Sequence, residues 1–229
     1  MHKIIPQAHE LFKNSGFDYC VCGGFALDMH AGKELRKHGD FDICVFREDK
    51  QKVLRFLQDN NWPVYARTAL KEFFLVTRPG DERLAELNNM WAVKPGSFAD
   101  MYLMEGSDNV YTYKIIEPRL QGFDFIEISF DERDGDGFAA DTHDGKGTKI
   151  TRALGKAVLY KDGIPYMAPE LILFFKAHPF NMEHEYLRPK TQHDFPAVLP
   201  LLDDEQRGWL MGAIRTAYPD GFPWLEGLL

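Results

Sequence analysis

Residues 22–46, CGGFALDMHAGKELRKHGDFDICVF, decide both the fold and the chemistry of this chain. Gly23 and Gly24 precede a helix-like segment, and such a turn exposes backbone N–H groups to an anion, commonly a phosphate. Asp40 and Asp42 are two residues apart on a predicted strand, so their side chains point to the same face. Two like charges on one face repel each other unless a cation lies between them. The stretch therefore predicts a site for a metal-bound nucleoside triphosphate.

Composition limits the remaining possibilities. The chain has 229 residues, enough for one large domain or two small ones, and 45% of them are hydrophobic. We expect a soluble cytoplasmic protein without a membrane partner, because no apolar run approaches the ~20 residues that a membrane span needs and no signal-like stretch is present. The formal net charge of −8 disfavours a nucleic-acid partner, and it is compatible with a cationic substrate or a bound Mg²⁺.

The residue pattern predicts a mixed α/β part followed by a helical part. Helices are expected over 6–15, 25–31, 48–60, 170–177, 191–202 and 204–218, and strands over 18–22, 40–46, 64–67, 73–77, 97–105, 111–116 and 123–130. A hairpin is expected over 156–167, and the segment 131–147 is expected to be a polar loop. We place the boundary between a catalytic domain, 1–165, and a C-terminal helical domain, 166–229, where the pattern becomes helical.

A third carboxylate on a neighbouring strand would complete the metal site. Asp100 is our choice, because it lies within an apolar strand-like segment, and Glu127 is the alternative. Mg²⁺ prefers such hard oxygen ligands, and two ions held this way can promote an in-line displacement at phosphorus. The amides of Gly23 and Gly24 and nearby basic side chains, among which we include Arg36, would then hold the phosphates.

The order of these motifs resembles a known family. Gly-Gly-x-Ala-Leu-Asp, followed by Gly32 and by Arg36-x-His38-x-Asp40-x-Asp42, is similar to the nucleotidyltransferase-fold enzymes that modify aminoglycoside and lincosamide antibiotics, and closest to their adenylyltransferase-like branch. The segments 169–176 and 188–195 resemble the C-terminal part of the same branch. Phe25 stands where the branch usually has Trp.

The resemblance implies a fold, an activity and a set of site residues. The implied fold is a small twisted mixed sheet with flanking helices, plus a helical C-terminal domain. The implied activity transfers a nucleoside monophosphate, usually AMP from Mg-bound ATP or another NTP, to a hydroxyl group. By position, Asp40 and Asp42 match the metal ligands, Gly23 and Gly24 match the phosphate-binding turn, and the basic helical positions near the nucleotide match Lys176 and Lys190.

The acceptor is inferred from charge, and three functions stay open. Acidic residues crowd into 131–144 and favour a small, cationic, aminoglycoside-like acceptor, because a cleft of one sign attracts ligands of the other. A second possibility is nucleotidylation of a protein or tRNA, as in a toxin–antitoxin pair. A third is a non-catalytic nucleotide-binding module, which would be expected to lack one of the acidic residues, whereas Asp40 and Asp42 are both present.

Overall fold

The chain forms two compact units in the computed structural model. The structure describes residues 2–68, 72–85, 87–97, 99–116, 122–142, 147–177, 179–180, 183–184 and 187–228. His2–Val21 and Arg36–Glu132 form one unit, here called the sheet unit, and Cys22–Leu35 with the chain from Arg133 onward forms the other, here called the helical unit. The domain boundary predicted near residue 165 stays a prediction.

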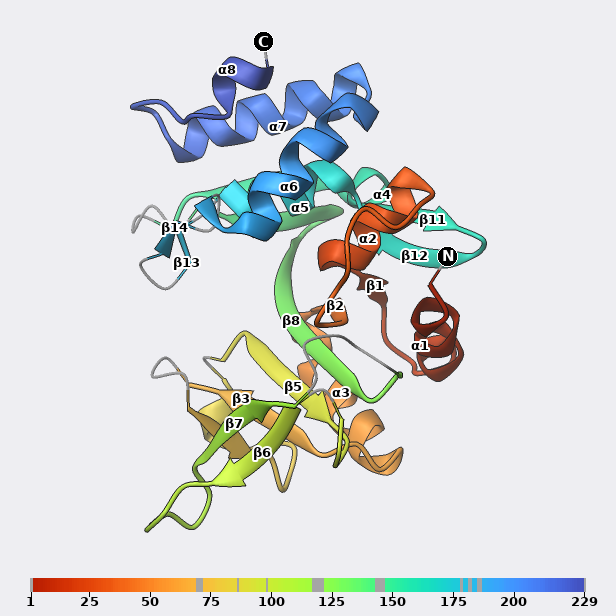
Figure 1. The fold of residues 1–229 in the computed structure, drawn as a ribbon, viewed down its shortest axis with the longest axis vertical. Coiled ribbons are helices and arrows are strands. Elements are labelled where there is room, and N and C mark those ends of the chain that lie inside the picture. Colours follow the sequence, from red (N-terminus) through yellow and green to blue (C-terminus); the bar gives the residue numbers. More distant parts are fainter. Residues whose placement is uncertain are drawn as a thin grey trace. The chain divides into compact units, whose positions relative to one another are not determined.

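The sheet unit is built on a mixed β-sheet (Figure 1). Its strand order is β1-β2-β8-β5-β3-β4-β7-β6. The elements in chain order are α1 (Ile4–Phe12), β1 (Tyr19–Val21), β2 (Asp42–Phe46), η1 (Arg47–Asp49), α3 (Lys50–Asp59), β3 (Val64–Arg67), β4 (Phe73–Leu75), η2 (Glu82–Leu84), β5 (Asn89–Val93), β6 (Ala99–Leu103), β7 (Tyr111–Ile115) and β8 (Phe125–Asp134).

One strand pair in this sheet is parallel. β2 and β8 run in the same direction, whereas β1 with β2, β8 with β5, and each further neighbouring pair run antiparallel. A parallel pair needs a long crossover connection, and here the chain builds α3 and five strands between β2 and β8. The predicted α/β fold with a mixed sheet is thereby confirmed.

Helix α3 covers one face of the sheet. Val53, Leu54 and Leu57 form the buried side of α3. The ammonium group of Lys50, at the start of α3, lies 5.2 Å from the ring centroid of Phe130 on β8. Side chains alternate along a strand, so α3 covers the face that Phe130 shares with residues 126 and 128, and residues 127 and 129 point to the opposite face.

The helical unit contains the segment that follows β1 and all elements after β8. These are α2 (Gly23–Ala31), β9 (Gly137–Asp141), β10 (Lys149–Ala153), α4 (Leu154–Ala157), β11 (Val158–Lys161), β12 (Ile164–Met167), α5 (Pro169–Ala177), β13 (Pro179–Phe180), β14 (Glu183–His184), α6 (Pro189–Val198), η4 (Leu199–Leu201), α7 (Asp204–Ala217) and α8 (Leu225–Leu228). Helix α2 packs against α5 and α6, and α5 packs against α7. Within the described part of the chain, no helix has the length and apolar character that crossing a membrane requires.

Helix α2 has well-defined ends. Gly23 starts the helix with φ +61°, and Gly32 ends it with φ +72°, both in the left-handed region that favours glycine. The Asp28 carboxylate accepts a hydrogen bond from the backbone N–H of Leu35 at 2.9 Å, which ties the helix to the segment after its C-terminus. The predicted helix 25–31 is confirmed, and it begins two residues earlier.

The hairpins show one correct expectation and one error. The predicted hairpin before α5 is present as β11–β12, and its turn places Asp162 and Gly163 at φ +52° and +80°. The expectation of a polar loop over 131–147 is wrong, because β8 continues to Asp134 and β9 pairs with β10 over residues 137–141. Strand β5 was not expected from the sequence at all.

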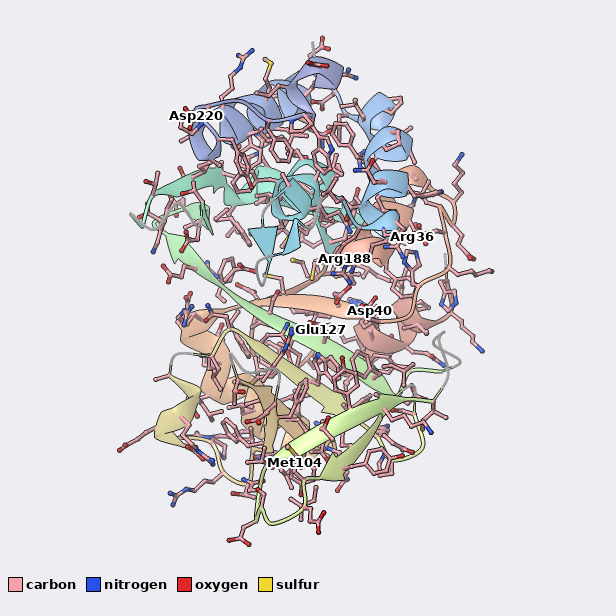
Figure 2. The ribbon with its side chains drawn as sticks, turned by 60° about the vertical axis from the view of Figure 1, so that its left-hand side comes forward. Arg36, Asp40, Met104, Glu127, Arg188 and Asp220 are labelled. Carbon is pink, nitrogen blue, oxygen red and sulfur yellow. The ribbon has the colours of Figure 1, made fainter. Side chains whose placement is uncertain are left out.

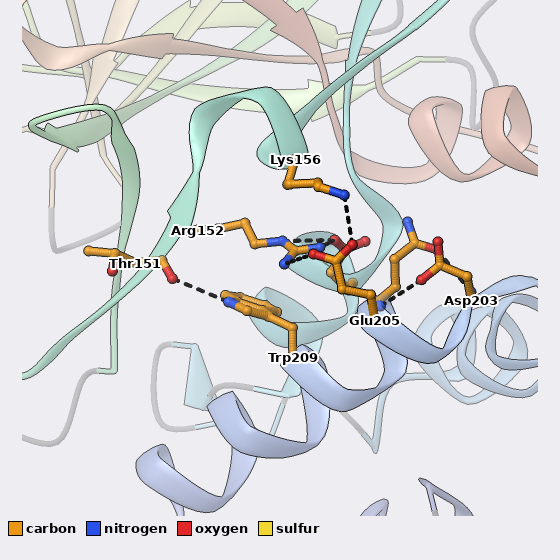
Figure 3. A network of polar contacts seen from close by, with 8 residues as sticks. Thr151, Arg152, Lys156, Asp203, Glu205 and Trp209 are labelled. Carbon is orange, nitrogen blue, oxygen red and sulfur yellow. Dashed lines mark hydrogen bonds and ion pairs between the residues drawn. The ribbon is translucent and has the colours of Figure 1, made fainter.

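A buried ion-pair network joins β10, α5 and α7 in the helical unit (Figure 3). The Arg152 guanidinium donates to the buried carboxylate of Glu170 at 2.7 and 3.1 Å, and it also reaches the exposed Glu205 at 3.1 Å. Glu205 in turn accepts a hydrogen bond from Lys156 at 2.7 Å. The second oxygen of Glu170, Oε2, is buried without a hydrogen-bond partner. Burial therefore raises the pKa of Glu170, although Arg152 opposes this change.

The two glutamates of this network should affect stability in opposite directions as pH changes. A carboxyl group whose pKa is raised by folding binds more protons in the folded state, so its contribution to the free energy of unfolding falls as pH rises above about 4.3. We therefore expect the stability of the wild type relative to Glu170→Gln to decrease from pH 4 to pH 7 in urea titrations. Glu205→Gln is the matched control. Lys156 lowers the pKa of Glu205, so the relative stability should increase over the same range. Equal slopes for the two variants would contradict the assignment.

Candidate active site

Three carboxylates gather on the face of the sheet opposite α3. One oxygen from each of Asp40, Asp42 and Glu127 lies within 4.8 Å of the others, and all three residues are half-buried. Figure 2 labels Asp40 and Glu127. Asp42 begins β2 and is the register partner of Glu127 on β8. The backbone N–H of Glu127 donates to the carbonyl of Phe41 at 2.8 Å, so the parallel ladder fixes the position of both strands. The cluster follows directly from the pairing of these strands.

The donor set of this cluster fits a divalent cation. Three carboxylates with oxygens within 4.8 Å of one another repel when they are ionised, and a bound divalent cation relieves this repulsion. Carboxylate oxygens are the ligands that Mg²⁺ prefers, and half-buried side chains leave room for the waters that Mg²⁺ keeps. The residues present therefore fit the expected metal.

Asn89 holds one of these carboxylates in place. Its side-chain amide, at the start of β5, donates to Oε1 of Glu127 at 2.5 Å. This bond fixes the orientation of the Glu127 carboxylate. Asn89 was not identified from the sequence, because its role depends on β5 lying beside β8, and β5 itself was not expected.

The structure does not bring Asp100 into the cluster. Asp100 lies on β6, and β5, β3, β4 and β7 separate that strand from β8 in the sheet order. Its carboxylate accepts a hydrogen bond from the Tyr102 hydroxyl at 3.1 Å, and Lys114 is its cross-strand partner. Glu127, the alternative considered from the sequence, occupies the third place instead.

The residues expected to bind phosphate belong mainly to the helical unit. Gly23 and Gly24 form the first turn of α2, whose N-terminal amides have no partners within the helix. Lys176 lies on α5 and Lys190 on α6, the two helices that pack against α2. Arg36 belongs to the sheet unit, is half-buried, and donates to the carbonyl of Lys37 at 3.1 Å.

Lys176 has a structural partner that the sequence did not indicate. Its ammonium group is buried and forms an ion pair with the buried carboxylate of Asp194 at 3.2 Å. Asp194 also lies 3.6 Å from Nδ1 of His193. A buried pair of this kind fixes α5 to α6, because removing one partner leaves an uncompensated buried charge. Lys190 is half-buried in the first turn of α6.

Comparison with known proteins finds the same class twice. Residues 4–78 match the family model described as aminoglycoside-2''-adenylyltransferase. The solved structure of the lincosamide antibiotic adenylyltransferase LnuA, with lincomycin bound, is similar at a TM-score of 0.51 and 14% identity, covering 88% of this chain and 98% of that chain. The structure of ANT(2")-Ia in complex with adenylyl-2"-tobramycin has a TM-score of 0.46 and 11% identity, covering 95% and 99%. No match exists among curated protein sequences.

These comparisons show the fold and a family match over part of the chain. The likeness to LnuA shows that the chain has the nucleotidyltransferase fold, and the family match lies over the segment that contains Gly23, Gly24, Asp40 and Asp42. The resemblance expected from the sequence, to the aminoglycoside and lincosamide nucleotidyltransferases, is confirmed. The partial family match and the fold agree with the predicted class of enzyme, a nucleotidyltransferase of the adenylyltransferase type.

Removing the Asn89 amide should weaken divalent-ion binding at the cluster. Groups that orient a metal ligand typically change metal affinity by about 10- to 100-fold when they are removed. We expect Asn89→Ala to reduce Mn²⁺ affinity by at least about tenfold, measured by electron paramagnetic resonance of free Mn²⁺. Asn88→Ala is the matched control, because the Asn88 side chain bonds to Arg47 instead. Equal Mn²⁺ affinity in the two variants would show that Asn89 does not position Glu127.

Proposed function

We propose that this protein is a Mg²⁺-dependent nucleotidyltransferase that moves a nucleoside monophosphate, AMP from ATP, to a hydroxyl group of a small molecule. The observation that carries this proposal is the cluster of Asp40, Asp42 and Glu127, with carboxylate oxygens within 4.8 Å of one another. The nucleotidyltransferase fold and the family match over residues 4–78 support it.

The roles of the sheet unit follow from its geometry. Asp40, Asp42 and Glu127 hold the metal, for which we propose two ions, and Asn89 orients Glu127. Bound Mg²⁺ supplies charge stabilisation for the phosphoryl oxygens and lowers the pKa of a hydroxyl group nearby. The acceptor oxygen forms a bond to the α-phosphorus, the bond from that phosphorus to the bridging oxygen breaks, and pyrophosphate leaves. The proton of the hydroxyl passes to a carboxylate oxygen of the cluster or to water.

The remaining proposed site residues bind the nucleotide. The N-terminal amides of α2, at Gly23 and Gly24, bind a phosphate group by donating hydrogen bonds to it. The N–H groups of a first helical turn and the helix dipole both favour negative charge there. Arg36, Lys176 and Lys190 supply positive charge. Lys176 acts partly through Asp194, since the pair fixes α5, which packs against α2.

The acceptor proposed here is a small hydroxylated compound. LnuA was solved with lincomycin and ANT(2")-Ia with an adenylylated tobramycin, and both ligands carry hydroxylated rings. The sequence prediction of a cationic acceptor depended on an acidic loop at residues 131–144. The structure has strands β8 and β9 there as far as residue 141. Asp131 accepts hydrogen bonds from Cys44 and Ser129. The proposal of an aminoglycoside-like acceptor therefore depends on the family resemblance and not on the acidic residues of 131–144.

Substitutions of the cluster residues and of Asp100 should have different effects on the rate of AMP transfer. We expect Asp42→Asn and Glu127→Gln each to lower the rate of AMP transfer roughly 100-fold or more, because a metal ion contributes several kcal/mol of charge stabilisation. Asp100→Asn should retain the wild-type rate. Transfer is measured with labelled ATP and a panel of hydroxylated acceptors by mass spectrometry, and circular dichroism checks the fold. Near-normal turnover in Asp42→Asn, or a large loss in Asp100→Asn, would overturn the assignment.

A further inference from the structure

A buried lysine holds the main chain that leads into β5. The ammonium group of Lys50, the first residue of α3, donates hydrogen bonds to three main-chain carbonyls. They belong to Leu84 (2.8 Å), Ala85 (3.3 Å) and Leu87 (2.7 Å). Only 5% of Lys50 is exposed. An ammonium group has three N–H donors and no acceptor, so three carbonyls can use all of its donors. The lysine therefore fixes the main chain between η2 and β5 at three points.

This segment leads directly to Asn89, the residue that orients Glu127. Leu87 lies two residues before Asn89, and the carbonyl of Asn88 between them accepts a hydrogen bond from the backbone N–H of Phe130 on β8 at 3.0 Å. The amide of Asn89 donates to Glu127 at 2.5 Å, but its Oδ1 is buried without a hydrogen-bond partner among the described residues. Because Oδ1 has no partner to fix the amide, the position of this side chain depends on the main chain at the start of β5.

We propose that Lys50 is a positioning residue for the carboxylate cluster, and that it raises the affinity of the cluster for a divalent cation. By holding the main chain before β5, Lys50 sets the place of Asn89 and, through Asn89, the orientation of Glu127. This inference rests on the proposed function of the cluster as a metal site. Lys50 lies on the side of the sheet that α3 covers, whereas Glu127 points to the opposite side. The lysine therefore acts across the sheet, without touching the metal or the nucleotide.

The positioning role and the charge of the lysine predict opposite effects on metal binding. A cationic side chain repels a divalent ion bound nearby, so its removal would strengthen metal binding if charge alone mattered. Loss of the hydrogen bonds instead releases the main chain at three carbonyls and leaves Asn89 less well placed to orient Glu127. A metal ligand that loses its supporting hydrogen bond binds the metal more weakly. The direction of the change in metal affinity therefore separates the two roles.

Mn²⁺ titrations of matched variants test this proposal. Lys50→Met removes the ammonium group and keeps an unbranched side chain. We expect it to weaken Mn²⁺ binding about three- to tenfold, less than Asn89→Ala, because it acts one step further from the ligand. Lys52→Met is the matched control, since Lys52 lies on the same helix, has a 63% exposed side chain and pairs with Asp49. It loses the same charge and should bind Mn²⁺ at least as tightly as the wild type. Circular dichroism confirms that each variant is folded at the temperature of the titration.

A double-mutant cycle tests whether Lys50 acts through Asn89. If it does, adding Lys50→Met to Asn89→Ala should cause no further loss of Mn²⁺ affinity, whereas independent effects would multiply. A second measurement uses the wild type alone and decides the matter even if Lys50→Met does not fold. Coupling between two parts of a protein is reciprocal, so a segment that promotes metal binding is itself stabilised by the metal. Bound Mg²⁺ should therefore slow hydrogen exchange in the peptide that contains Leu84 and Leu87.

The outcomes distinguish failure of this inference from failure of the proposed function. Absence of Mn²⁺ binding by the wild type would overturn the proposed function. If the wild type binds Mn²⁺, three results would overturn the positioning role alone. These are unchanged or tighter binding in folded Lys50→Met, a loss of the same size in Lys52→Met, and a multiplied loss in the double variant. Unchanged hydrogen exchange in the wild type on addition of Mg²⁺ would also overturn it.

Discussion

The parallel pairing of β2 with β8 is the constraint on which the rest of the sheet unit depends. It sets Asp42 opposite Glu127, and the chain before β2 adds Asp40 to the same cluster. Hydrogen bonds along the ladder, such as that from the Glu127 amide to Phe41, hold three like charges closer together than they would lie if the side chains were free. Because strand alternation sends residues 126 and 128 to the other face, the same pairing also fixes which face α3 can cover.

The two units differ in the signs of the charges that lie next to one another. In the helical unit, two buried ion pairs join elements, Lys176 with Asp194 and Arg152 with Glu170. Such pairs contribute little net stability but are costly to break, so they hold helices in one arrangement. In the sheet unit, three carboxylates of the same sign lie together, and the neutral amide of Asn89 donates to Glu127. The sheet unit is therefore electrostatically suited to a ligand, and the helical unit to rigidity.

The sequence predicted features that depend on neighbouring residues. The glycine pair before α2, the Asp40-x-Asp42 spacing and the turn at Asp162 and Gly163 each follow from local backbone preferences. The identity of the third carboxylate does not follow from local preferences. Choosing Glu127 over Asp100 requires the order of strands in the sheet, which no local pattern contains. The segment after 130 was mistaken for a loop because its acidic residues mask strand alternation. Asp131 is accommodated there by hydrogen bonds from Cys44 and Ser129, which a single sequence does not show.

The distance along the chain between β2 and β8 has a consequence for folding. Hairpins such as β6–β7, β9–β10 and β11–β12 join segments that are adjacent in sequence, so they close short loops. The β2–β8 ladder closes a loop that includes α3 and five strands, and contacts of high sequence separation carry a larger entropic cost before they form. We therefore expect this ladder to form late in folding, so that a nascent or partly folded chain has its hairpins but lacks the carboxylate cluster and does not sequester divalent ions.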